Sequence, residues 1–391
     1  MLKEKYLVQK QKPGALTGVN VLDLSRLLPG PYCSMILADH GARVIAVEDK
    51  RFLADGLFLN LINRNKEHMS LNLKTEKGKE IFFRLIQNTD VLLEGFRPGV
   101  VDRLGVDYQT VREINPKIIY CSITGYGQDG PFRDRAGHDA NYMSYAGVLD
   151  LIGEADRPPS IPGVPIADMA GGSMNAAIGI LLALFARQNT GKGQYIDISM
   201  TGGMVAFLPT ALFFRQLTGQ EPARADGLFS HRYACYNTYE TADGQFLSIG
   251  AVEKRFWRQL CDLLGVAEYA DLQYDDQRRL EILNSMRQAF KQKTLDEWNA
   301  VFGDKDVCWG RVQSLSEVLE DPLFRQREMV VEIEGNDGKP SKTLGVPVKL
   351  SDTPGAVRTP PVDFGESTPE ILRELGYSDN EIKRFEEDGV V

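Results

Sequence analysis

His138 and Asp139 are adjacent in this 391-residue chain and put one titratable base and one carboxylate at a single location. Histidine changes its charge near neutral pH, which suits a residue that accepts and returns protons. The pair follows a glycine-rich stretch, residues 124–130, after a predicted strand, and loops at the carboxyl ends of parallel strands often carry active sites. The same pattern fits a helix-capping aspartate beside a surface histidine, so residue types alone leave both interpretations open.

Asp168 and Glu253 each stand where a helix is predicted to start. Asp168 lies between Pro165 and a long uncharged stretch, where the helix dipole would favour its ionised form. Glu253 opens the predicted helix over residues 253–264. Either residue could be only a cap, and the pattern does not separate capping from catalysis.

The elements expected around these residues alternate between strand and helix. Strands are predicted at residues 19–24, 43–47, 91–93 and 118–123, and helices at 31–40, 76–87 and 108–114. This alternation implies βαβ units, an α/β fold and a mostly parallel sheet. From about residue 233 a hairpin at Asp243-Gly244 and several helices predict a smaller α+β domain over residues 225–330.

Charge and motifs exclude several classes of protein. The chain carries 45 Lys and Arg against 54 Asp and Glu, a formal net charge of −9, and no basic run suited to nucleic acid. The first predicted strand–helix turn lacks G-x-G-x-x-G, so we expect no nucleotide redox cofactor. No HExxH motif or Cys/His cluster has ligand spacing, so we expect no metal.

The expected compartment is the cytoplasm. Five scattered cysteines without a CxxC motif indicate free thiols, and the first residues lack the apolar core of a signal peptide. Residues 169–186 and 198–214 are uncharged and could pass for a membrane hairpin. Their glycines and Pro209 make them less apolar than spanning helices, so we predict buried helices against a sheet and no membrane partner.

Several motifs in a fixed order resemble the family III CoA-transferase superfamily of CaiB/BaiF type. They are residues 16–48, 63–66, 71–74 and 94–105, followed by ITGYGQDGP, GHDANYMSYAGVL, TGKGQYIDISM and ESTPEILRELGYSDNEI. The resemblance implies a Rossmann-like large domain at residues 1–224, the small domain at 225–330, and a return segment at 331–391 that completes the large domain. It also implies two chains interlocked as a homodimer, although some members pair with a paralogous chain.

Within this superfamily, the motifs are most similar to the α-methylacyl-CoA racemase type. The similarity implies that His138 and Asp168 are bases on opposite faces of the substrate α-carbon. Asp139 stands beside the histidine, and Glu253 would orient the imidazole, as carboxylates do in other histidine-based sites. The implied activity is racemisation of a 2-methylacyl-CoA thioester by two-base proton transfer.

The alternative is a CoA-transferase that uses the same loop differently. In transferases resembling this chain, the carboxylate that matches Asp139 attacks the thioester and forms covalent intermediates. His138 is the main discriminator, because transferases often carry a bulky or aromatic residue there.

The resemblance also implies a set of CoA-binding residues on the large domain. These are Arg64, Asn72, Leu73, Lys74 and Arg97, of which the basic ones would meet phosphates and residues 71–74 would lie near the adenine. For the acyl group, Met143, Tyr145 and residues 200–214 could line an apolar pocket or could equally be core.

Overall fold

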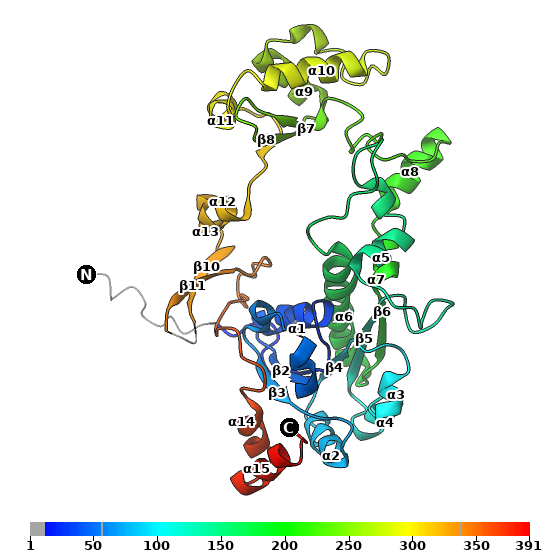
Figure 1. Ribbon diagram of the computed structural model, residues 1–391, viewed down its shortest axis with the longest axis vertical. Coiled ribbons are helices and arrows are strands. Elements are labelled where there is room, and N and C mark those ends of the chain that lie inside the picture. Colours follow the sequence, from blue (N-terminus) through cyan, green and yellow to red (C-terminus); the bar gives the residue numbers. More distant parts are fainter. Residues whose placement is uncertain (1–11, 56–57, 336–337) are drawn as a thin grey trace, which may run out of the picture. The chain divides into compact units, whose positions relative to one another are not determined.

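The computed structural model describes residues 12–55, 58–335 and 338–391, which divide into two compact units (Figure 1). The large unit contains the described residues up to Ala146, then Pro162–Phe207 and Pro322–Val391. The small unit contains Gly147–Ile161 and Leu208–Asp321. Each unit has its own hydrophobic core. The domain boundaries expected at residues 224 and 330 stay predictions.

The large unit is built on a six-stranded parallel sheet. Its strands, from one edge to the other, are β3 (Glu67–Ser70), β2 (Arg43–Glu48), β1 (Asn20–Asp23), β4 (Val91–Glu94), β5 (Ile119–Thr124) and β6 (Tyr195–Ser199). All neighbouring strands run parallel, which confirms the predicted α/β fold with a mostly parallel sheet. Strand order reverses between β1 and β4, and such switch points form crevices at the carboxyl ends of the strands.

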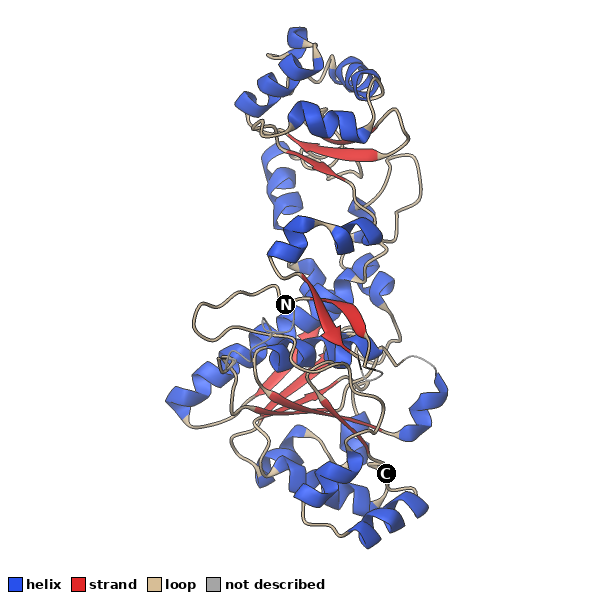
Figure 2. Ribbon diagram, turned by 90° about the vertical axis from the view of Figure 1, so that its left-hand side faces the viewer, coloured by secondary structure: helices blue, strands red, loops and turns tan. Residues whose placement is uncertain are grey.

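Helices cover both faces of this sheet (Figure 2). On one face, α1 (Pro29–Asp39) and α6 (Asn175–Thr190) pack on the strands. The opposite face is covered by α2 (Glu76–Ile86), α4 (Tyr108–Ile114), α14 (Thr368–Glu374) and α15 (Asp379–Glu387). The last two helices place Ile371, Leu372 and Phe385 in the same core as the strand residue Leu92, so distant parts of the chain share one core.

The small unit contains an antiparallel sheet with helices packed on it. Its strands are β7 (Tyr236–Glu240), β8 (Phe246–Gly250) and β9 (Trp309–Arg311), and its core helices are α9 (Lys254–Leu264), α10 (Arg279–Phe290) and α11 (Leu295–Phe302). The predicted Asp243-Gly244 turn joins β7 to β8, with Gly244 at a φ of +74° that suits glycine. Trp257, Phe290 and Phe302 are fully buried in this core.

Shorter elements complete both units. They are α3 (Val100–Leu104), α5 (Asp139–Tyr145), α7 (Met200–Val205), α8 (Pro209–Thr218), α12 (Leu315–Glu320), α13 (Pro322–Gln326), β10 (Val330–Glu334) and β11 (Pro340–Leu344). A π-helix, Ala167–Met174, precedes α6 directly. Short 3-10 turns lie at Lys50–Asp55, Asn60–Asn63, Leu149–Leu151 and Ala267–Tyr269.

The two uncharged stretches are less buried than the sequence predicts. Within the described residues, the helical run Ala167–Thr190 is long and apolar enough to cross a membrane by length and composition alone. Its inner side packs on β5 and β6, but Ile178, Leu182 and Phe185 are each more than half exposed. In the second stretch, α8 buries no residue at all. The expectation of buried helices against a sheet therefore holds for the inner side of Ala167–Thr190 and is wrong for α8 in this single chain.

Glu94 ends β4 and is buried, where its carboxylate accepts a hydrogen bond of 2.7 Å from the backbone N–H of Phe96. Loss of solvation raises the pKa of Glu94 to about 7. The hydrogen bonds from Ser122 and Phe96 lower this pKa, but their effect is smaller than that of burial. The folded chain therefore holds a proton that the unfolded chain releases at lower pH. Stability from this group is present at low pH and is lost as pH rises through about 7.

Glu94→Gln mimics the protonated acid, so the variant should gain stability over the parent as pH rises. We expect little difference at pH 5 and an advantage on the order of 2 kcal/mol at pH 8, measured by urea denaturation. Glu113→Gln, at an exposed position on α4, is the matched control and should show no such trend. Equal stability of Glu94→Gln and the parent at pH 8 would contradict a protonated Glu94.

Candidate active site

The residues His138 and Asp139 lie at the start of α5. His138 is the N-cap residue, with extended backbone, and its N–H donates to the side-chain oxygen of Asn141 over 3.0 Å. Its imidazole is exposed, whereas Asp139 in the first turn is half-buried. The cap position is thus held by the histidine, and the carboxylate of Asp139 has another partner.

That partner is Asp168, whose backbone N–H donates to Oδ1 of Asp139 over 2.9 Å. Asp168 lies in the first turn of the π-helix, after the N-cap residue Ile166, so it is not the helix cap that its sequence position suggested. Wide helical turns of this kind occur mostly as local features and often at functional sites. The structure therefore brings together three of the predicted site residues: His138, Asp139 and Asp168.

The electrostatics of Asp168 reflect this neighbourhood. Burial raises the pKa of Asp168 to about 6, the charge of Asp139 raises it further, and His138 lowers it. A carboxylate with a pKa close to the working pH can both accept and return a proton. The charges of the three side chains therefore influence one another, and the pKa of Asp168 lies in the range in which a carboxyl group can exchange a proton near neutral pH.

Ser173 anchors the π-helix from inside the large unit. Its buried hydroxyl lies 2.6 Å from the carbonyl oxygen of Pro29, at the start of α1, and 2.9 Å from the carbonyl oxygen of Asp168. Glycines allow α7 to pack closely on the other side, because a Cβ added to Gly203 would lie 2.5 Å from the carbonyl oxygen of Gly171. The position of Asp168 is therefore fixed by α1 and α7 together.

Tyr142 fills the space between the His138 loop and the β5 loop. A Cβ added to Gly125 or Gly137 would lie 2.4 Å or 2.7 Å from the tyrosine ring, so both positions require glycine for this packing. The hydroxyl donates to the carbonyl oxygen of Gly137, directly before His138. Burial and the charge of Asp168 raise the pKa of Tyr142 to about 12, and Arg97 lowers it. The predicted CoA-binding residue Arg97 therefore also lies near this cluster.

A separate cavity of about 260 Å³ lies in the large unit at the carboxyl ends of β1, β2 and β4. Its wall combines apolar side chains with basic and acidic ones, among them Leu24, Phe52, Leu71, Leu73, Arg26, Arg51, Lys74, Glu48 and Asp49. Glu48 pairs with Arg26 and Asp49 with Arg51. Arg26 stacks on Phe52, with its guanidinium carbon 3.5 Å from the ring centroid. The predicted residues Leu73 and Lys74 thus line a cavity at the switch point of the sheet. Asn72 anchors their loop by donating its backbone N–H to the carbonyl oxygen of Val390 over 2.8 Å.

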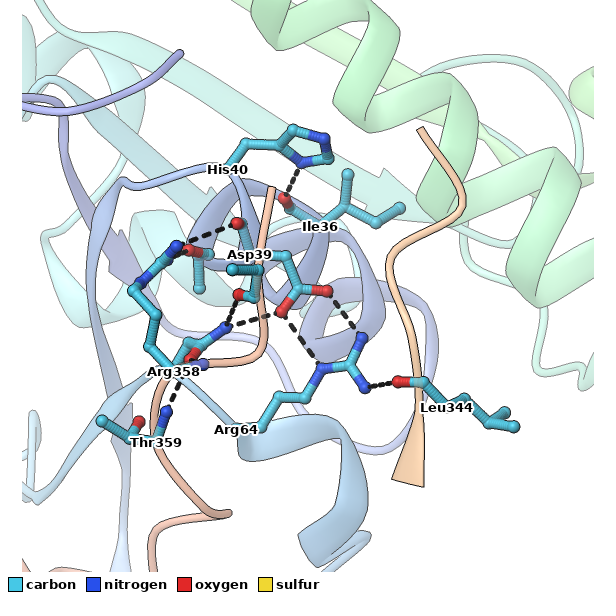
Figure 3. Close-up of polar contacts among 10 residues, drawn as sticks. Ile36, Asp39, His40, Arg64, Leu344, Arg358 and Thr359 are labelled. Carbon is cyan, nitrogen blue, oxygen red and sulfur yellow. Dashed lines mark hydrogen bonds and ion pairs between the residues drawn. The ribbon is translucent and has the colours of Figure 1, made fainter. Parts of the chain in front are cut away.

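Arg64 lies in a different environment from the one predicted for a phosphate ligand. Figure 3 shows its guanidinium paired with the carboxylate of Asp39, at 3.1 Å and 2.7 Å, and also donating to the carbonyl oxygen of Leu344. The pair is buried, and Arg358 donates to backbone carbonyls beside it. If Arg64 moved away from Asp39 to bind a phosphate, the carboxylate of Asp39 would remain buried without a partner. This geometry therefore favours a structural role for Arg64.

Two basic residues at the cavity were missed from sequence. Arg26 and Arg51 line it, yet only Lys74 was predicted there. For Arg51 a signal was available in the basic pair Lys50-Arg51, which follows the predicted strand at residues 43–47 after Glu48 and Asp49.

Glu253 lies in the small unit, as the exposed N-cap of α9, so its role beside His138 stays a prediction.

Comparison with known proteins gives the same family as the sequence motifs. The family model "CoA-transferase family III" matches residues 16–368. The chain belongs to CoA-transferase family III. Members of this family act on CoA thioesters, so the family III chain is an acyl-CoA enzyme.

Relatives of both predicted kinds resemble this family III chain. The human protein named alpha-methylacyl-CoA racemase is 36% identical over 381 residues, 96% of this chain and 97% of that protein. A protein from Fusarium pseudograminearum named acyl-CoA transferase is 33% identical, over 97% of this chain and 88% of its own length. The crystal structure of a CaiB/BaiF family protein from Brucella suis is 31% identical, covers 93% of this chain and 100% of its own, and has a TM-score of 0.82.

Removing the Ser173 hydroxyl should loosen the segment that carries Asp168. We expect Ser173→Ala to lower the free energy of unfolding by about 1–2 kcal/mol, because buried carbonyl groups lose a hydrogen bond. Urea denaturation measures this loss. Ser144→Ala is the matched control, since its hydroxyl also donates to a backbone carbonyl but is exposed, and should change stability by less than about 0.5 kcal/mol. Equal effects of the two variants would contradict the anchoring role.

Proposed function

We propose that this family III chain racemises the α-carbon of a 2-methylacyl-CoA thioester by two-base 1,1-proton transfer. The observation that carries the proposal is the convergence of His138 and Asp168 at one site, with the pKa of Asp168 raised to about 6. In this scheme His138 serves one face of the α-carbon and Asp168 the other. Glu253 would orient the imidazole.

The proton transfers balance without any redox partner. The thioester acidifies the α-proton; one base removes it, and the electron pair is held as an enolate. The other residue, already protonated, returns a proton to the opposite face. The reverse reaction starts from the opposite protonation state. In both directions, therefore, one of the two residues is protonated and the other is not.

We propose that the CoA moiety is bound in the cavity at the switch point. The apolar residues Leu71 and Leu73 and the ring of Phe52 suit a flat adenine, and Arg26, Arg51 and Lys74 suit phosphates. Arg97, near Tyr142, would lie between this cavity and the reacting carbon. The cavity wall carries these three basic groups against the two carboxylates of Glu48 and Asp49, and in an acidic protein this local excess of positive charge attracts a polyanionic ligand.

We further propose a homodimer that works in the cytoplasm. The exposed apolar side chains of α6, including Ile178, Leu182 and Phe185, support an association that covers them. A second copy fits the interlocked arrangement that the family resemblance implies. Pairing with a paralogous chain is the other outcome, and the mass of the purified assembly distinguishes the two.

The second candidate function is CoA transfer between carboxylic acids, favoured by the half-buried carboxylate of Asp139 and by the transferase relatives. A carboxylate oxygen of Asp139 would attack the thioester carbonyl, break the C–S bond and release CoA thiolate from an acyl-aspartyl anhydride. The thiolate then attacks the aspartyl carbonyl and expels the first acid, leaving an aspartyl-CoA thioester. A second carboxylate accepts CoA by the same steps in reverse.

Proton exchange separates the two functions. A single-enantiomer 2-methylacyl-CoA in heavy water should gain deuterium at the α-carbon and lose optical purity without any acid acceptor, as mass spectrometry and chiral analysis would show. His138→Gln should abolish both changes. His231→Asn is the control, because His231 is exposed and its φ of +61° is tolerated by asparagine. CoA transfer to an added carboxylate without exchange, with hydroxylamine trapping at Asp139, would favour the second function.

The pH dependence of racemisation should report Asp168. Below a pH of about 6 Asp168 becomes protonated and can no longer accept a proton, so kcat/KM should fall about tenfold per pH unit. Both enantiomers should show the same profile, because the equilibrium constant between enantiomers does not depend on pH. Asp168→Asn should be inactive at every pH. A profile of the parent that stays flat down to pH 5 would exclude Asp168 as a base.

A further inference from the structure

Arg135 lies between two aromatic rings on the loop that leads to His138. Its guanidinium carbon is 4.8 Å from the ring centroid of Phe132 and 4.9 Å from that of Tyr145. One guanidinium nitrogen donates to the hydroxyl of Tyr145. An arginine held by stacking and a hydrogen bond is positioned before any ligand arrives, so little side-chain freedom is lost on binding.

The rings around Arg135 form one cluster that reaches the active site. Phe132 and Tyr145 are 4.9 Å apart, and Tyr126 lies 5.7 Å from each of them. Tyr126 is also 5.3 Å from Tyr142. Because Tyr142 is within electrostatic reach of Asp168 and Asp139, the aromatic cluster is continuous with the proposed reaction centre.

The guanidinium group and two of the rings in this cluster are exposed to solvent. Phe132 is 38% exposed and Tyr145 is 49% exposed, and Arg135 is exposed as well. Among the described residues, Arg135 has no carboxylate within ion-pairing distance, whereas Arg133, two residues earlier, lies 3.7 Å from Asp134. The remaining guanidinium N–H groups can therefore bind an external anion, and a planar fork of donors matches a carboxylate.

We propose that Arg135, Phe132 and Tyr145 form a subsite for a carboxylate at the far end of the acyl group. The aliphatic part of the acyl chain lies against the rings, and the terminal carboxylate pairs with the guanidinium. The substrate class is then the mono-CoA thioester of a branched dicarboxylic acid. This inference rests on the proposed function only in placing the acyl group at the His138 site, and it holds equally if the site transfers CoA.

Binding of unreactive thioethers tests the subsite without any proton or acyl transfer. Two analogues of equal chain length, S-(3-carboxypropyl)-CoA and S-butyl-CoA, differ only in the terminal carboxylate. By calorimetry the parent should bind the carboxypropyl analogue about tenfold more tightly than the butyl analogue. Arg135→Gln should remove this preference and leave the affinity for S-butyl-CoA unchanged. Arg133→Gln is the matched control and should keep the preference.

The other outcomes overturn the proposal in distinguishable ways. If Arg135→Gln lowered the affinity for both analogues equally, the guanidinium would be binding a CoA phosphate instead of the terminal carboxylate. No preference in the parent, or a preference unchanged by Arg135→Gln, would mean that Arg135 does not meet the acyl group. Arg135→Lys serves if the glutamine variant fails to fold: it keeps the charge but loses the planar fork, and should retain only part of the preference. Failed racemisation with an intact preference would count against the proposed function alone.

Discussion

The hydrogen bond from the backbone N–H of Asp168 to the carboxylate of Asp139 is the contact on which the site depends. It joins the first turns of α5 and the π-helix, which are 29 residues apart in sequence. The donor is the backbone N–H of Asp168, so this contact leaves the carboxyl group of Asp168 available for the proposed proton transfer. Burial raises the pKa of Asp168 and the charge of the same carboxylate raises it further, so this contact fixes the position of Asp168 and contributes to its charge state.

Close packing supports this contact from every side. Gly125 and Gly137 leave room for the ring of Tyr142, and Gly171 and Gly203 let α7 approach the π-helix. Interiors packed to this density deform little, so a group held by several elements keeps its position when substrate binds. The CoA cavity, by contrast, is formed by loops at the strand ends, which tolerate more variation.

The parallel sheet could be predicted because apolar runs alternate with segments of helical spacing along the chain. The site at His138 and Asp139 could be predicted because two reactive side chains are adjacent in one loop. The strand β3 was missed because Glu67 and His68 are polar, and their partners come from distant parts of the chain. A π-helix has the same residue pattern as an ordinary helix start, so Asp168 looked like a cap. Arg64 was expected to bind a phosphate of CoA, because nothing in the sequence shows that it pairs with Asp39 inside the fold.

The core shared by β4 and the helices α14 and α15 has a consequence for synthesis of the chain on the ribosome. Residues 208–321 of the small unit are made before these helices, and they contain their own hydrophobic core. The small unit can therefore fold while the part of this face of the larger sheet that α2 and α4 do not cover is still exposed. During that interval the sheet is the aggregation-prone part of the nascent protein, and chaperone binding should concentrate on the face that α14 and α15 later cover.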